Sequence, residues 1–177
     1  MANYAYCDLI IQHSDPAMIA RMVTAYMKGQ LFGDYLPCPP ELDDVYSFHG
    51  DEQDEEKKLR CRTNYEKYGF ETAFDWRCLH WGAAWEMGIR SSCSTLTILG
   101  ETKLKLETST KWTAPTEVLN HWVKLGYDIE GTIDSDTTNS MHDEYKNGVM
   151  RTVIYDREQY EAVFGKIVEE AAGIDCC

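Results

Sequence analysis

The sequence lacks the short motifs that identify the common classes of nucleotide-binding and hydrolytic enzymes. It contains no glycine-rich phosphate-binding loop, no GxGxxG dinucleotide fingerprint and no GxSxG nucleophile elbow. Basic residues are also scarce, because 17 lysines and arginines face 30 acidic residues and leave a net charge of −13. A phosphate backbone attracts basic surfaces, so this balance disfavours direct binding to nucleic acid. We assign no catalytic residue and no cofactor.

Long hydrophobic runs are missing as well. No window approaches the roughly 18 apolar residues that a membrane span requires. The first residues, MANYAYCDLIIQHSDP, lack the basic and apolar regions of a signal peptide. The seven cysteines are odd in number and scattered, which favours reduced thiols over a disulfide framework. We therefore expect a cytoplasmic protein that has no contact with a membrane.

The length and composition predict a single folded domain. A chain of 177 residues with 44% hydrophobic and 12% aromatic residues can bury a substantial core. We assign residues 1–177 to this one domain and expect the tail at 173–177 to be frayed. The sequence does not predict an oligomeric state.

The order of hydrophobic patterns predicts an α+β fold. Helices are predicted by capping residues and 3.6-residue periodicity, and strands by alternation of apolar and polar residues. The predicted strands are residues 3–12, 91–99, 102–110, 127–134 and a final pair at 144–146 and 149–156, and the predicted helices include 14–29, 113–126 and 157–172. This order fits a ferredoxin-like antiparallel sheet with helices packed on one face.

Three details of these helices and strands can be checked directly. Ser14 is the expected N-cap of the first helix, which should end at Gly29. Thr113 is the expected cap of the later helix, with Pro115 in its first turn and Leu125 on its inward face. Leu104 and Leu106 alternate with charged residues, which predicts one buried and one solvent-exposed face for their strand.

A proline-rich acidic insertion is predicted at residues 30–70. The pair Pro39 and Pro40 excludes a continuous helix or a central strand at that point, and a helix is predicted from about 51 to 67. Acidic side chains precede basic ones along that helix, as its dipole favours. We identify as candidate partner-binding residues the acidic run Glu41, Asp43, Asp44, Asp51, Glu52, Asp54, Glu55 and Glu56. A solvated loop with a charged helix start explains the same run equally simply.

The segment FDWRCLHWGAAWEMG, residues 74–88, concentrates aromatic side chains and could indicate either a reactive centre or a core. At helical spacing Phe74, Cys78 and Trp81 share a face, and a second apolar arc carries Leu79. Cys78 and His80 are two residues apart and diverge on a helix, so they make a poor metal site. We therefore predict a helix packed on two sides, broken at Gly82, with a strand after it. No metal site is assigned.

Several of these stretches also resemble a known family. The segments MANYAYC, LPCPPEL, YGF with FDWRCLHWGAAWEMG, and ETSTKWTAPTEVLNHWVKLGYDI are similar to YubB-type ferredoxin-like proteins of phages and conjugative plasmids. The most specific matches are Tyr68, Gly69, Trp76, Trp81, Gly82 and Trp85. His80 departs from the pattern, which more usually has asparagine there. The resemblance implies a ferredoxin-like fold and a setting among accessory genes that counter host defences, and it implies no catalytic residues.

These observations lead to one main functional hypothesis and two alternatives. The main hypothesis is a non-enzymatic phage or plasmid protein in the host cytoplasm. It would bind and inhibit a host defence or nucleic-acid-handling complex by placing its acidic surface against a basic one. One alternative is a small enzyme or sponge that binds a nucleotide signal in a pocket. The other is a plain structural or assembly factor.

Overall fold

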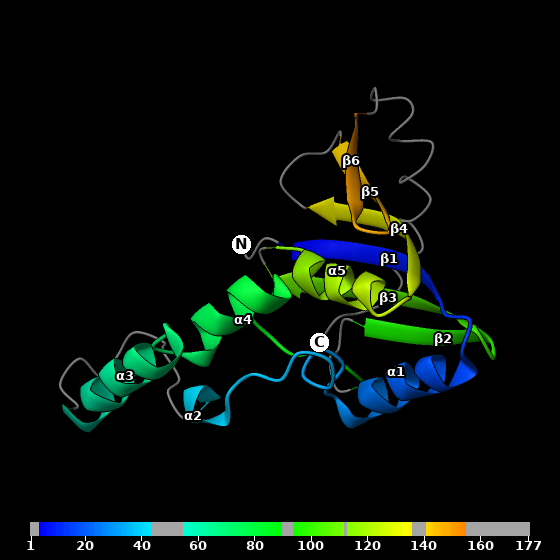
Figure 1. Cartoon of the computed structure of the whole chain (residues 1–177). Coiled ribbons are helices and arrows are strands. Elements are labelled where there is room, and N and C mark those ends of the chain that lie inside the picture. The colour runs from blue at the N-terminus through cyan, green and yellow to red at the C-terminus, as the bar shows by residue number, and fades with distance from the viewer. Residues whose placement is uncertain (1–3, 44–54, 90–93, 112, 136–140, 155–177) are drawn as a thin grey trace, which may run out of the picture.

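The computed structural model describes residues 4–43, 55–89, 94–111, 113–135 and 141–154 (Figure 1). Its central element is a six-stranded sheet in the order β2-β3-β1-β4-β5-β6, in which every neighbouring pair of strands is antiparallel. The strands are β1 (Tyr4–Gln12), β2 (Ser94–Gly100), β3 (Lys103–Lys111), β4 (Asp128–Ser135), β5 (Met141–Lys146) and β6 (Val149–Ile154).

Four of these strands and two helices form a ferredoxin-like arrangement. Helix α1 (Pro16–Lys28) is the first helix between β1 and β2, and α5 (Thr116–Lys124) connects β3 to β4. The two strand-helix-strand units interleave, so β3 lies between β1 and β2, and β1 lies between β3 and β4. The hairpin of β5 and β6 extends the sheet beyond β4. The predicted α+β fold is therefore confirmed.

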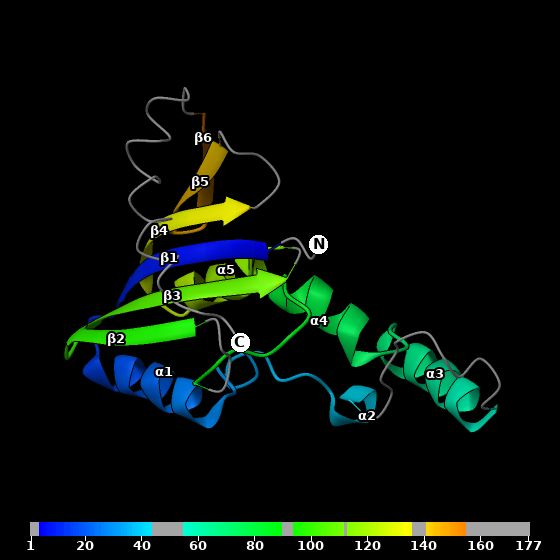
Figure 2. The same ribbon diagram turned by 180° about the vertical axis from the view of Figure 1, so that it is seen from behind.

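One face of the sheet carries the core, and α1 and α5 cover it (Figures 1 and 2). Strand alternation explains the choice of face, since side chains two residues apart point the same way. Leu104 and Leu106 are buried, as their alternation with lysines predicted. The buried residues of β1 are Ala5, Cys7, Leu9 and Ile11, and the helices add Ile19, Met22, Tyr26, Val118, Leu119 and Trp122.

The helix ends differ from the sequence expectation at two places. Asp15, and not Ser14, caps α1, because its carboxylate accepts a hydrogen bond from the Ala17 N–H at 2.9 Å. Helix α5 begins only at Thr116. Thr113 does not cap it and instead donates its hydroxyl hydrogen bond to the Gly82 carbonyl. Leu125 follows the last turn of α5 and is 38% exposed, so its predicted inward position is wrong.

The aromatic segment forms helix α4 (Ala73–Trp81), which ends at Gly82 as predicted. Trp81 is fully buried against Phe32, so the core interpretation holds for that face. On the second predicted side Trp76 is half-buried and packs against the core, but Leu79 is 62% exposed, so its predicted burial is wrong. Residues 83–87 form no strand. The Glu86 carboxylate accepts hydrogen bonds from the backbone N–H groups of Phe32 and Gly33, which holds this segment against the loop after α1.

Two further helices lie between α1 and α4, namely α2 (Pro40–Asp43) and α3 (Glu55–Tyr68). The predicted insertion at 30–70 begins with residues that belong to the main core, since Leu31, Phe32 and Tyr35 are buried there. The turn at Asn147 and Gly148 joins β5 to β6, with positive φ angles of 47° and 87°. The predicted closing helix at 157–172 and the tail at 173–177 lie outside the described residues.

Candidate functional site: a helical arm

Helices α2, α3 and α4, with residues 69–72 that join α3 to α4, extend away from one end of the sheet (Figures 1 and 2). We call this part of the molecule the arm. Pro40 is the first residue of α2, where a proline loses no helical hydrogen bond. Thr72 caps α4 by accepting a hydrogen bond from the Asp75 N–H at 3.3 Å and donating one to the Asp75 carboxylate at 2.8 Å. Local sequence therefore determines where each helix of the arm begins.

The base of the arm is fixed by Trp81. Its ring lies 5.8 Å from Phe32 in an edge-on arrangement, and its indole N–H donates to the Leu36 carbonyl at 2.8 Å. The Arg77 guanidinium lies over the Trp81 ring, 5.0 Å from its centre, and pairs with Asp43 of α2. One aromatic residue thus joins α4, α2 and the main core.

Helix α3 is attached by polar contacts. Its buried residue is Asn64, whose side-chain amide donates to the backbone carbonyls of Glu41 and Glu71, both at 3.3 Å. Lys67 adds an ion pair with Glu41 at 2.8 Å. Helices in folded domains normally bury an apolar stripe, and one that is polar all round either spans between bodies or depends on ion pairs. Helix α3 leaves Leu59 and Tyr65 exposed to solvent, whereas Cys61 and Tyr68 of the same helix are half-buried.

The structure describes four of the eight predicted partner-binding residues. Glu41 and Asp43 lie in α2, and Glu55 and Glu56 form the first turn of α3. All four belong to the arm, so the structure brings them to one part of the molecule. The remaining four, Asp44, Asp51, Glu52 and Asp54, lie outside the described residues.

Each of these four acids has a basic partner. Glu55 pairs with Lys58 at 2.8 Å and Glu56 with Arg60 at 2.7 Å, both within α3. The partners of Glu41 and Asp43 come from other helices of the arm, as described above. Helix α3 itself holds three acidic and five basic side chains, an excess of two positive charges. The described arm therefore carries charges of both signs, and these four carboxylates are already ion-paired.

Sequence reasoning missed the partners that are distant along the chain. Lys67 and Arg77 are 26 and 34 residues from the acids they bind, and no local spacing indicates such pairs. The Lys67 hydrogen bond is the main reason that the pKa of Glu41 is lowered to about 2, with its own backbone and Tyr68 as smaller causes. The three exposed hydrophobic residues of the arm, Leu59, Tyr65 and Leu79, were also missed as surface residues.

Aromatic contacts order the side of α4 that carries Trp76, a residue that also packs against the core. The His80 imidazole stacks on Trp76 with ring centres 4.1 Å apart, and its Nδ1 lies 2.8 Å from the Trp76 carbonyl. Phe70, just before α4, contacts the same imidazole edge-on at 5.4 Å. This histidine therefore serves as an aromatic packing partner one helical turn from Trp76.

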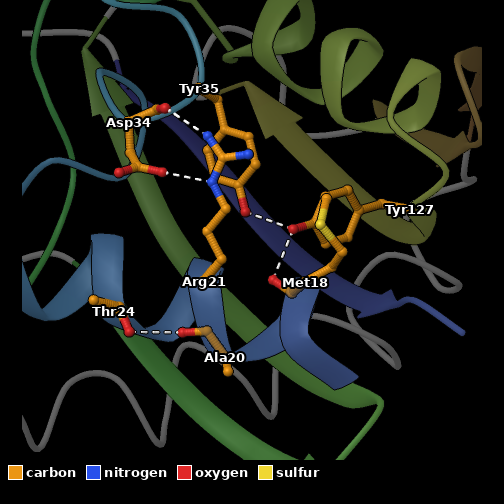
Figure 3. Close-up of polar contacts among 7 residues, drawn as sticks. All are labelled: Met18, Ala20, Arg21, Thr24, Asp34, Tyr35 and Tyr127. Carbon is orange, nitrogen blue, oxygen red and sulfur yellow. Dashed lines mark hydrogen bonds and ion pairs between the residues drawn. The ribbon is translucent and has the colours of Figure 1, made fainter. Parts of the chain in front are cut away.

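A second polar cluster lies between α1, the loop after it and β4 (Figure 3). Arg21 donates to the side chain and the backbone carbonyl of Asp34, both at 2.8 Å, and its guanidinium covers the Tyr35 ring at 4.2 Å. The hydroxyls of Tyr35 and Tyr127 are 2.5 Å apart, and Tyr127 donates to the Met18 carbonyl at 2.8 Å. These groups satisfy one another's hydrogen bonds, so the cluster holds α1, the loop after it and the start of β4 together.

The described residues show little sign of redox or metal chemistry. Cys7, Cys38, Cys61 and Cys78 are free thiols, and burial raises the pKa of Cys7 to about 12, which keeps it protonated. Within the part of the chain that the structure covers, no three histidine, cysteine or acidic side chains are grouped to hold a metal ion. Among the helices described, none has the length and apolar character needed to cross a bilayer.

Comparison with known proteins yields one solved structure. No family model matches the sequence, and no curated protein matches it. The chain is similar to the crystal structure of protein api92 from Yersinia pseudotuberculosis, which is assigned to the family model DUF1281. The two share 10% sequence identity with a TM-score of 0.48, over 88% of this chain and 99% of that one.

Proposed function

We propose that this protein is a non-enzymatic binding protein that uses the arm to bind and inhibit a host protein or protein complex with a basic surface. The observation that supports this proposal is helix α3, which projects from the domain with Leu59 and Tyr65 exposed. The resemblance to phage and plasmid proteins gives the setting of the proposal, a host defence or nucleic-acid-handling complex.

The ion pairs of the arm are compatible with binding to a basic partner. The side chains of Glu55 and Glu56 are 78% and 74% exposed, and such surface pairs contribute roughly 0–1 kcal/mol each. Lysine and arginine side chains of a partner can therefore replace Lys58 and Arg60 at little cost. Leu59 and Tyr65 would supply the apolar contact that salt does not screen.

The first experiment is affinity capture from host lysate at low and high salt, followed by mass spectrometry. The test variant is Glu55→Gln with Glu56→Gln, which removes charge without introducing repulsion beside Lys58 and Arg60. The matched control is Glu130→Gln, because Glu130 also forms an exposed ion pair, with Lys146 at 3.2 Å on the sheet. We expect the arm variant to lose a partner that wild type and control both retain.

A second pair of variants tests the apolar contribution. Leu59→Ser removes an exposed hydrophobic side chain from the arm, and Val149→Ser removes one that is 67% exposed on β6. Both changes affect exposed positions, so neither should lower the thermal unfolding temperature appreciably. We expect only Leu59→Ser to weaken capture at high salt.

Other outcomes would contradict the proposal. Absence of any stoichiometric partner at low salt would count against it. Stabilisation of the protein by a nucleotide in a thermal-shift screen would favour the alternative of a nucleotide-binding pocket. Salt-sensitive capture of nucleic acid alone would instead point to the excess basic residues of α3.

A further inference from the structure

Strand β2 is an edge of the part of the sheet that the structure describes. In the described sheet, β2 and β6 each have a neighbouring strand on one side only. The sequence of β2, STLTILG, contains no charged residue and no proline, which are the usual means by which proteins protect an edge. Ile98 is 60% exposed and Leu99 is 50% exposed. An exposed apolar edge of this kind is a template for pairing with another strand.

The charge around β2 favours a second copy of this chain as the other strand. A chain with a net charge of −13 repels itself over most approaches. The hairpin of β2 and β3 is nearly neutral, since it carries Lys103, Lys105 and Lys111 against Glu101 and Glu107, and Lys105 is itself paired with Asp8 and Glu107. Two copies can therefore approach through this hairpin without the repulsion that the whole molecule would otherwise impose. The opposite edge is less suited, because β6 carries Arg151 in the middle of its sequence.

We propose that β2 pairs antiparallel with β2 of a second copy, around a two-fold axis at Thr97, and so joins the two sheets into one. In an antiparallel pair, directly opposite residues point to the same face. A register centred on Thr97 places Thr97 opposite its own copy. Because the interface is symmetric, Ile98 of each copy also lies opposite Leu96 of the other copy.

The structure favours this register over neighbouring ones. Leu96 lies on the core face and is half-buried there, so pairing it with Ile98 extends the hydrophobic layer across the junction. The start of β2 is already tied to its own chain, since the Tyr26 hydroxyl donates to the Ser94 carbonyl at 2.8 Å. At the C-terminal end of β2, the register of its pairing with β3 shifts between Ile98 and Gly100. The regular part of the strand therefore ends near Ile98. Thr97 therefore lies near the middle of the usable edge.

The size of the contact predicts a weak dimer. Strand β2 has seven residues, and pairing along one such edge lies at the small end of protein interfaces. We expect dissociation in roughly the micromolar range, so the dimer forms and dissociates as concentration changes. The dimer would carry two arms, and a target with repeated sites would then bind both with increased avidity. This inference does not depend on the function proposed for the arm.

The self-facing position of Thr97 allows a specific test with purified protein. Thr97→Lys and Thr97→Glu each place like charges opposite one another, so we expect each variant alone to sediment as a monomer of 20.4 kDa. An equimolar mixture of the two places lysine opposite glutamate, and we expect it to recover a species of twice that mass. The matched controls are Val149→Lys and Val149→Glu on the other edge, which should dimerise as wild type does. Circular dichroism confirms that each variant is folded.

Three results would overturn the inference. The first is a wild-type protein that remains monomeric at the highest concentration that stays soluble. The second is a dimer that Thr97→Lys leaves intact or that Val149→Lys dissociates. The third is a mixture of the two Thr97 variants that stays monomeric although each variant is folded, which would exclude the register centred on Thr97. Because no lysate or target is present, none of these results bears on the binding proposed for the arm.

Discussion

Two tyrosine hydroxyls join the loop after α1 to the start of β4. Because Tyr127 donates its proton to the Met18 carbonyl, Tyr35 must donate to the Tyr127 oxygen across the 2.5 Å between them. Burial is the main reason that the pKa of each phenol is raised, so both stay protonated through the neutral range and into mild alkali. Their order in the chain of hydrogen bonds makes the two hydroxyls unequal, although both rings are buried.

Removal of the two hydroxyls should therefore have different costs. Tyr127→Phe leaves both the Met18 carbonyl and the Tyr35 hydroxyl without their partner, and should lower the free energy of unfolding by about 2–3 kcal/mol. Tyr35→Phe leaves the bond from Tyr127 to Met18 intact and should cost about 1 kcal/mol. Urea denaturation measures both, with Tyr65→Phe on the exposed surface of α3 as the control. Equal costs would contradict the assigned direction of the bonds.

The carboxylate of Glu41 reports directly on the contact between α2 and α3. Its folded pKa is lowered below the unfolded value of roughly 4.3, so its pairing stabilises the arm above that pH and is lost as the pH falls toward 2. In an NMR titration we expect a midpoint near 2 for Glu41 in wild type. Lys67→Gln should return it toward 4.3, and added salt should move it in the same direction. A midpoint that Lys67→Gln leaves unchanged would show that the pair does not form in solution.

At the scale of single elements, the junction of α4 and α5 depends on Gly82. Its φ angle is +75°, and a Cβ there would lie 2.8 Å from the Ala114 carbonyl oxygen and 3.0 Å from the Thr116 nitrogen. Gly69, which ends α3, has a φ angle of +76° and open space around it. The backbone strain of an alanine is therefore the same at both positions, and only Gly82 adds a collision between two backbones.

Alanine substitution separates these two contributions. Gly69→Ala should cost about 1 kcal/mol for the left-handed conformation alone. Gly82→Ala should cost a further 1–3 kcal/mol, roughly, because α5 or α4 must shift to relieve the collision. Denaturant titration of both variants gives the difference. Similar losses of unfolding free energy in the two variants would mean that the start of α5 moves freely. In that case the junction of α4 and α5 would not depend on Gly82.

The same elements indicate which features a sequence can predict. The helix end at Gly82 and the alternation of Leu104 and Leu106 depend on residues within one turn or one strand, and both were predicted correctly. The strand expected at residues 83–87 was wrong, because Glu86 holds that segment through backbone groups more than fifty residues away. The capping role expected of Thr113 failed for a similar reason, since Gly82 takes its hydroxyl. Local patterns predict local structure until a distant partner competes.

For the whole molecule, the ferredoxin-like order was predictable and the shape of the arm was not. Alternating strands and amphipathic helices are strong periodic signals, and their order in the chain leaves few sheet topologies. The candidate site was predicted only as a run of acidic residues. Its ion pairs with Lys67 and Arg77 join separate helices, and the exposure of Leu59 depends on the direction in which α3 projects. Neither property leaves a local pattern in the sequence.

This division between domain and arm predicts an uneven distribution of stability. Amides of β1 lie at the centre of the sheet, between β3 and β4, and should exchange with solvent only through global unfolding. Amides of α3, which is held by Asn64 and ion pairs, should exchange through a smaller opening of lower free energy. Native-state hydrogen exchange followed by NMR or mass spectrometry measures both classes in one experiment.

Asn64→Ala isolates the attachment of the arm. The variant removes both hydrogen bonds from the Asn64 amide, so exchange in residues 55–68 should accelerate about five- to thirtyfold while exchange in β1 stays as in wild type. Thr63→Ala is the matched control, because Thr63 is exposed and bonds only within its own helix, to the Leu59 carbonyl at 2.9 Å. Equal acceleration in β1 and α3 would mean that the arm unfolds together with the sheet. In that case α3 would be an integral part of the domain, and the argument that it projects in order to meet a partner would lose its physical basis.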